Sequence, residues 1–228
     1  MELDFQTCSF FDRHLIYFVS VVSNIRVRED FAKMVSQLNS AEKNVFLALF
    51  ENIVEHTPKV AEELFELRPF SNNGEFLSAV GAVIGGLAHS EKVVSIFCVP
   101  FIIRNTKVMM ITEQVGILSG HPDLAGRLAD ANLLTPESTR EQREAGLHLL
   151  TAEERRRLRS HNAEYRHKFG FTFVICAREN KAAAILGGLS TRLDNTKDQE
   201  VDIGIEEVKK IAKLRAADIL KTVCTSKL

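Results

Sequence analysis

Apolar residues recur at three- and four-residue steps along most of this chain, which is the spacing of one face of an α-helix. The spacing runs from about Glu42 to Pro58, continues over 60–67, and returns from Gly74 to about Ala88. Few alternating segments are long enough for strands. The pattern predicts an all-α protein, a single compact helical domain of about eight helices.

Capping signals mark two helices in the second half of the chain. Thr135 followed by Pro136 places a cap and a first-turn proline at the start of a helix that we expect to run to about Leu150. The next helix is expected to begin near Thr151 and to reach Lys168. Its inward positions are predicted to be Leu158, His161 or Asn162, and Tyr165.

A final long helix is predicted from about Gln199 to Thr222, and Arg215 interrupts its apolar face. A guanidinium that turns inward keeps its charge, so it needs a carboxylate, backbone carbonyls or an anionic ligand. The periodicity leaves open an internal salt bridge, an arginine that reaches the edge of the core, and a ligand-binding arginine. The stripe comprises Ile205, Val208, Ala212, Arg215 and Ile219.

Two stretches break the helical pattern. Residues 1–36 mix aromatic and charged residues without a clear period, and residues 93–112 are rich in β-branched and aromatic residues around Pro100. We therefore expect a helical domain over 37–225 with an irregular N-terminal extension and an apolar insert. Such an insert has to pack as an added hairpin or helix, or it remains an exposed aggregation risk.

Composition narrows the functional classes. With 228 residues and 45% hydrophobic content, the chain can bury one good core. Its net charge of -1 gives no long-range attraction to the phosphates of a nucleic acid, so nucleic-acid binding is disfavoured. The four cysteines form no CxxC pair, so neither a zinc site nor a redox dithiol is expected, and a reducing compartment fits. The apolar run over 15–22 is too short to cross a bilayer, so we expect no membrane anchor.

A basic cluster and the last three residues also suggest partners. Residues 155–159 carry four arginines, either as a phosphate- or RNA-binding patch or as a solvated helix face with acidic partners, and the balanced charge favours the solvated face.

Ser226, Lys227 and Leu228 match the tripeptide that the peroxisomal import receptor reads at a free C-terminus. We therefore expect peroxisomal localisation; the alternative is a frayed polar tail.

His121 is the first candidate for chemistry. Pro122 disfavours the α conformation for the residue before it and so fixes the local backbone. Because histidine changes charge near neutral pH, an imidazole aimed from a loop-to-helix junction is a candidate proton donor or acceptor. The alternative is a helix-start histidine that hydrogen-bonds only locally.

Four separated segments together resemble the family of 2-oxo-4-hydroxy-4-carboxy-5-ureidoimidazoline (OHCU) decarboxylases of urate degradation. The order and spacing of the segments carry the resemblance, which covers the chain from about Leu38 onwards apart from the insert. The segments are His121 to Gly126, Thr135 to Leu147, Tyr165 to Arg178, and Glu206 to Arg215.

The resemblance implies an all-helical, cofactor-free and usually dimeric carboxy-lyase without a metal. Its substrate would be OHCU and its product (S)-allantoin, the last step from urate to allantoin. His121 would be the catalytic proton donor, with Glu141 and Arg215 as its charged companions. The substrate-binding residues would be Pro122, Ser138, Thr139, Arg140, Glu141, Gln142, and the backbone of Phe173, Val174, Ile175, Cys176 and Ala177.

The chain departs from the family at three places. Thr172 replaces the usual proline, which frees a backbone N–H and loosens a loop that should grip the ligand. His161 stands where leucine is common. Removing 93–112 joins 89–92 to 113–118 much as the family reads, so we hypothesise an unspliced or misassigned segment, which sequencing the transcript would test. The alternative function is a non-catalytic helical interaction protein whose site the insert disrupts.

Overall fold

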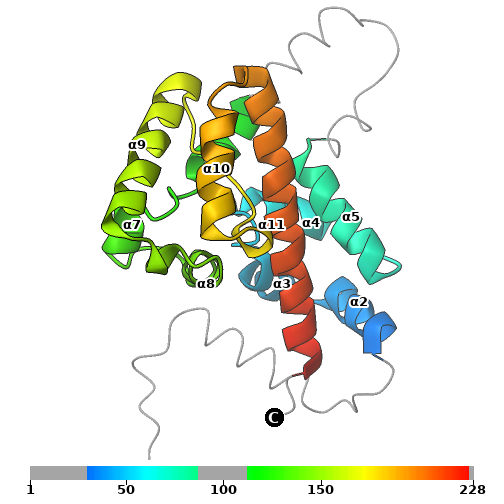
Figure 1. Cartoon of the computed structure of the whole chain (residues 1–228). Helices are drawn as coiled ribbons and strands as arrows, with labels where there is room; N and C mark the ends of the chain where they lie inside the picture. Colours follow the sequence, from blue (N-terminus) through cyan, green and yellow to red (C-terminus); the bar gives the residue numbers. More distant parts are fainter. Residues whose placement is uncertain (1–29, 87–111, 226–228) are drawn as a thin grey trace, which may run out of the picture. The chain divides into compact units, whose positions relative to one another are not determined.

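The computed structural model describes residues 30–86 and 112–225, and every regular element within these ranges is a helix (Figure 1). This confirms the all-α class. The C-terminal tripeptide, the predicted insert up to residue 111 and the extension up to residue 29 lie outside the described residues. The chain divides into two compact units: unit 1 holds the residues up to Val83 and from Ala212 onwards, and unit 2 spans Ile84–Ile211.

In the part of unit 1 that the structure describes, there are four helices and the C-terminal half of a fifth. The four are α2 (Asp30–Ser40), α3 (Lys43–Phe50), α4 (Lys59–Glu66) and α5 (Asn73–Ile84), and the fifth is α11 (Lys197–Thr225). α3 packs against α4. Because α2 already begins at residue 30, part of the predicted extension is helical.

An aromatic cluster fills the core of unit 1. The ring centroids of Phe46 and Phe50 lie 4.9 Å apart, and those of Phe50 and Phe76 lie 5.1 Å apart. The Arg68 guanidinium lies 3.5 Å from the centroid of the Phe65 ring and donates to the carbonyls of residues 38, 39 and 41. Arg68 therefore satisfies carbonyl groups around the end of α2 that have no partner within the helix.

Unit 2 contains the helix over 112–120 and the N-terminal half of α11. The helix over 112–120 packs close to α11, since a Cβ atom at Gly204 would lie only 2.8 Å from the Leu118 side chain. The ring centroids of Tyr165 and Phe169 lie 4.5 Å apart in its core. Its other elements are α7 (Arg127–Asp130), α8 (Pro136–Glu144), η2 (Leu147–Leu149), α9 (Ala152–Phe169), η3 (Ala177–Glu179) and α10 (Ala182–Arg192).

The predicted helix starts are confirmed at both capping signals. The Thr135 side chain accepts a hydrogen bond from the Ser138 N–H at the start of α8, and Thr151 forms a capping box with Glu154 at the start of α9. On α9 the predicted inward residues Leu158, Asn162 and Tyr165 are buried, and His161 is half-buried.

Three helices end earlier than the sequence predicted. α3 is followed by turns that contain His56 with φ 50°, α5 by Gly86 with φ 73°, and α8 by Gly146 with φ 83°. A residue in the left-handed conformation cannot continue a right-handed helix, so Gly86 and Gly146 stop α5 and α8 within two residues of their ends. His56 lies six residues beyond Phe50, so it excludes only an extension of α3 as far as Pro58. The predicted ends were Pro58, about Ala88 and about Leu150.

The basic cluster of α9 is a solvated face with acidic partners, as the balanced charge favoured. Arg155 lies 3.6 Å from Asp130, which also pairs with Arg159, and Arg156 pairs with Glu153. No helix in the described part of the chain is both long and apolar enough to cross a bilayer.

Candidate functional site

His121 lies directly after a helix, so the prediction that it stands at the entry to one is wrong. Its N–H donates to the Leu118 carbonyl at 3.3 Å, at the end of the helix over 112–120. The next residue, Pro122, has no N–H to extend the helix, and α7 begins only at Arg127. The proline thus fixes the exit from one helix, and not the start of another.

A backbone carbonyl orients the imidazole of His121. Nδ1 lies 2.9 Å from the Ile117 oxygen, and the side chain is buried. A carbonyl oxygen can only accept, so Nδ1 carries the hydrogen in the neutral ring. Nε2 is therefore the nitrogen that gains or loses a proton, as a general acid or base requires.

The loop after His121 is tied to α8 and α9. The Ala125 N–H donates to the Gln142 side chain at 2.9 Å, and Asn162 donates to the Leu124 carbonyl at 3.2 Å. Ala125 has a positive φ of 47°, which is unusual for a residue with a Cβ atom. These two side chains from different helices therefore hold a loop conformation that the backbone alone would disfavour.

The α8 residues that were predicted to bind substrate lie on two faces of this helix. Ser138, Glu141 and Gln142 are buried, and their i, i+3, i+4 spacing places them on one face. Thr139 and Arg140 are exposed. The structure therefore groups three of the five predicted residues on the inward side of α8.

The other predicted binding segment, 173–177, is irregular up to Cys176 and then enters η3, which packs against α8. Ile175 is half-buried, whereas the other residues of the segment are buried. Burial raises the pKa of the Cys176 thiol, which disfavours the thiolate. Cys176 is therefore suited to contribute its backbone and not a nucleophile.

Arg166 of α9 connects Thr172, the residue before this segment, with the loop after His121. It donates to the Asp123 carboxylate at 2.5 Å and to the Thr172 hydroxyl at 3.3 Å. A proline at position 172 could accept no such bond through its side chain. The Thr172 side chain therefore makes a hydrogen bond that proline could not make, and the sequence did not predict this bond.

Arg215 belongs to unit 1, whereas His121 and Glu141 belong to unit 2. One nitrogen of its guanidinium, Nη1, donates to the Glu55 carboxylate at 2.9 Å and to the Asn52 carbonyl at 3.0 Å. Arg215 and Glu55 are 3% and 1% exposed. Of the alternatives left open, the internal salt bridge is confirmed.

The sequence alone did not identify Glu55. The sequence signalled only that an inward Arg215 needs a carboxylate, backbone carbonyls or an anionic ligand, and Glu55 lies 160 positions earlier in the chain. Arg166 and Asn162 were also missed as supports of the predicted site. No group of three metal-ligating side chains that could hold an ion occurs among the residues described here.

The comparisons with known proteins decide the family. The family model for OHCU decarboxylase matches residues 39–217, which include His121, Glu141 and Arg215. This chain belongs to the OHCU decarboxylase family. The match runs through α8, α9 and α10 and through most of α11.

Two curated OHCU decarboxylases are similar over most of their length. The protein of Amia calva is 39% identical over 189 residues, which are 83% of this chain and 95% of that protein. The protein of Mus musculus is 37% identical over 81% of this chain and 91% of its own length. A crystal structure of an OHCU decarboxylase in the presence of (S)-allantoin has the same fold, with a TM-score of 0.55, 22% identity, and coverage of 79% of this chain and 99% of that one.

Proposed function

We propose that this OHCU decarboxylase family member converts OHCU to (S)-allantoin, the last step from urate to allantoin. The observation that carries the proposal is the family match over residues 39–217. The buried, oriented imidazole of His121 fits the proton chemistry that this reaction needs.

The substrate itself provides the electron sink. Its carboxylate and a hydroxyl sit on one ring carbon, beside a carbon that is doubly bonded to nitrogen. When the bond to the carboxylate breaks, carbon dioxide leaves and the electron pair moves into this neighbouring unit. One proton must then be added to the enol-like intermediate, and its addition on one face gives a single enantiomer.

We assign this proton transfer to Nε2 of His121. Because the Ile117 carbonyl binds Nδ1, the ring presents Nε2 in a fixed direction. A positioned acid–base group typically contributes about 10² to 10⁴ in rate.

Glu141 and Arg215 are assigned to binding and orientation. Glu141 is buried on α8 beside Ser138 and Gln142, and we assign it to the ureido or ring nitrogens of the substrate. Arg215 is assigned to an anionic or carbonyl part of the substrate. Glu55 and the Asn52 carbonyl fix the plane of its guanidinium, which favours directional binding.

Fresh OHCU, generated in situ from urate, tests the proposal. The protein should accelerate the appearance of the circular dichroism signal of (S)-allantoin over the uncatalysed decay. Decay to racemic allantoin at the uncatalysed rate would reject decarboxylase activity and leave a non-catalytic interaction protein.

Two finer properties are part of the proposal. We propose import into peroxisomes through Ser226-Lys227-Leu228, which a fluorescent fusion that keeps this tripeptide at its end would test against one lacking it. We also propose a homodimer, as in the family, which light scattering would test. Large exposed apolar side chains mark candidate association surfaces, and Leu133 and Leu149 of unit 2 are 69% and 75% exposed.

A further inference from the structure

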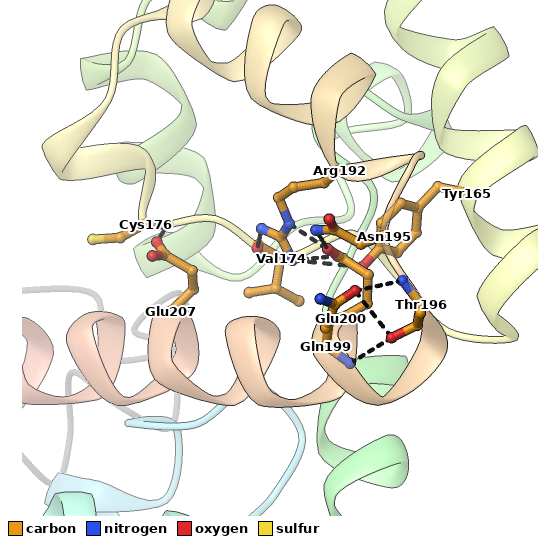
Figure 2. A network of polar contacts seen from close by, with 9 residues as sticks. All are labelled: Tyr165, Val174, Cys176, Arg192, Asn195, Thr196, Gln199, Glu200 and Glu207. Carbon is orange, nitrogen blue, oxygen red and sulfur yellow. Dashed lines mark hydrogen bonds and ion pairs between the residues drawn. The ribbon is translucent and has the colours of Figure 1, made fainter.

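The irregular backbone over 174–176 is held by side chains from two helices. A segment without helix or strand must find other partners for its buried peptide groups. Figure 2 shows that Arg192, at the end of α10, lies beside Val174, and that Glu207, on α11, lies beside Cys176. These four residues all belong to unit 2.

Arg192 holds the carbonyl side of the segment. Its Nη1 donates to the Val174 oxygen at 2.8 Å, and its guanidinium lies 4.5 Å from the centroid of the Phe173 ring. Its Nε donates to Glu200 at 2.9 Å. The guanidinium is thus fixed by a carboxylate and an aromatic face while it binds the backbone.

Glu200 anchors this arginine from the core. It is fully buried and accepts a hydrogen bond from Asn195 at 2.6 Å and another from the Tyr165 hydroxyl. Burial, together with the hydrogen bond to Glu200, raises the pKa of Tyr165, so that this hydroxyl stays a donor. Arg192 is therefore held by a buried carboxylate whose position is fixed by further hydrogen bonds.

Glu207 holds the N–H side of the segment. Its Oε2 accepts from the Cys176 N–H at 2.7 Å, and its Oε1 accepts from Lys210 at 2.6 Å. The hydrogen bond to Glu207 raises the pKa of Lys210. Lys210 thus neutralises the carboxylate on its solvent side while the other oxygen binds the backbone.

Ile175 lies between the two tethered peptide groups. It is the one residue of 171–177 that is not buried, and in the described part of the chain neither its N–H nor its C=O has a protein hydrogen-bond partner. We infer that Arg192 and Glu207 are positioning residues, which fix Val174 and Cys176 so that the peptide groups of Ile175 meet the substrate in one orientation. The inference rests on the proposed function, in which 173–177 binds through its backbone.

Variants of Glu207 test the inference, because Arg192 also binds the fully buried Glu200, so replacing Arg192 would disturb that network as well. Glu207→Ala removes the tether, and Glu207→Asp withdraws the carboxylate by one methylene while keeping its charge. Both should raise KM for OHCU about tenfold, the equivalent of about 1.4 kcal/mol, with kcat within about threefold. Glu207→Gln keeps an oxygen at the same reach, so its KM should stay within about threefold of the parent.

Glu206→Ala is the matched control, because Glu206 is the neighbouring acid and pairs with Lys209 in the same i,i+3 geometry. Its KM should be unchanged. An unchanged KM in Glu207→Asp, or equal KM values in the Asp and Gln variants, would overturn the inference. The comparison of these two variants remains decisive even if Glu207→Ala fails to fold. An inactive parent protein would instead reject the proposed function itself.

Discussion

Among single residues, His121 is oriented by a hydrogen bond to the carbonyl group of Ile117. The sequence pointed to this histidine through the proline that follows it. It could not predict the hydrogen on Nδ1, because this depends on the position of a backbone oxygen one helical turn earlier. For the same reason, it could not predict that Arg166 would bind both Asp123 and Thr172.

His161 offers a test at this scale. Its Nδ1 is buried and has no hydrogen-bond partner among the described residues. A buried unsatisfied polar atom costs about 1 to 3 kcal/mol, and leucine removes it without loss of apolar volume. His161→Leu should therefore raise Tm by about 3 °C or more in a thermal melt. His167→Leu, at an exposed position of α9, is the control without such a gain, and a lower Tm for His161→Leu would contradict the interpretation.

At the scale of elements, sequence patterns located helix starts better than helix ends. Thr135 and Thr151 cap the predicted helices, since caps are local hydrogen bonds between nearby residues. The end of α3 at Phe50 is marked by no glycine or proline, and the left-handed His56 follows only six residues later. The conformation of 173–177 depends on Arg192 and Glu207, which lie in two later helices.

Gly126 tests how closely the loop after His121 is packed. A Cβ atom there would lie 2.6 Å from the Asp123 Cβ atom and 3.0 Å from its carbonyl oxygen, so Gly126→Ala must move this loop. We expect a loss of about 1 to 3 kcal/mol of stability in denaturant titrations, together with lower decarboxylase activity.

Gly187→Ala is the matched control for this substitution. Gly187 lies within α10 and has open space around it, so alanine should stabilise the helix by about 1 kcal/mol. If the two alanine variants had the same stability and activity, close packing of the His121 loop would be ruled out.

Across the whole molecule, the family match spans residues of both units. Within unit 1, Arg215 ties α11 to the loop after α3 through two hydrogen bonds, one to the Glu55 carboxylate and one to the Asn52 carbonyl. The sequence predicted that an inward Arg215 needs a carboxylate, backbone carbonyls or an anionic ligand, but only the fold pairs it with Glu55. The pair therefore has a structural role beside any role in catalysis.

Two variants separate the two roles of Arg215. Arg215→Met leaves the Glu55 carboxylate buried without this partner and should cost about 3 to 5 kcal/mol, which lowers Tm by about 10 °C. Replacing both residues by methionine should restore much of the stability, because apolar pairs of similar volume often substitute for buried ion pairs. The double variant should nevertheless lack decarboxylase activity. Activity near that of the parent would show that Arg215 acts only in the fold.

In the proposed mechanism His121 transfers the proton that makes (S)-allantoin, and the turnover of fresh OHCU by His121→Asn tests this role. Asparagine can still donate to the Ile117 carbonyl but cannot exchange a proton near neutral pH. We expect an unchanged fold, a kcat at least about 100-fold lower and loss of the enantiomeric excess. A kcat within a few-fold of the parent, with (S)-allantoin still in excess, would contradict it.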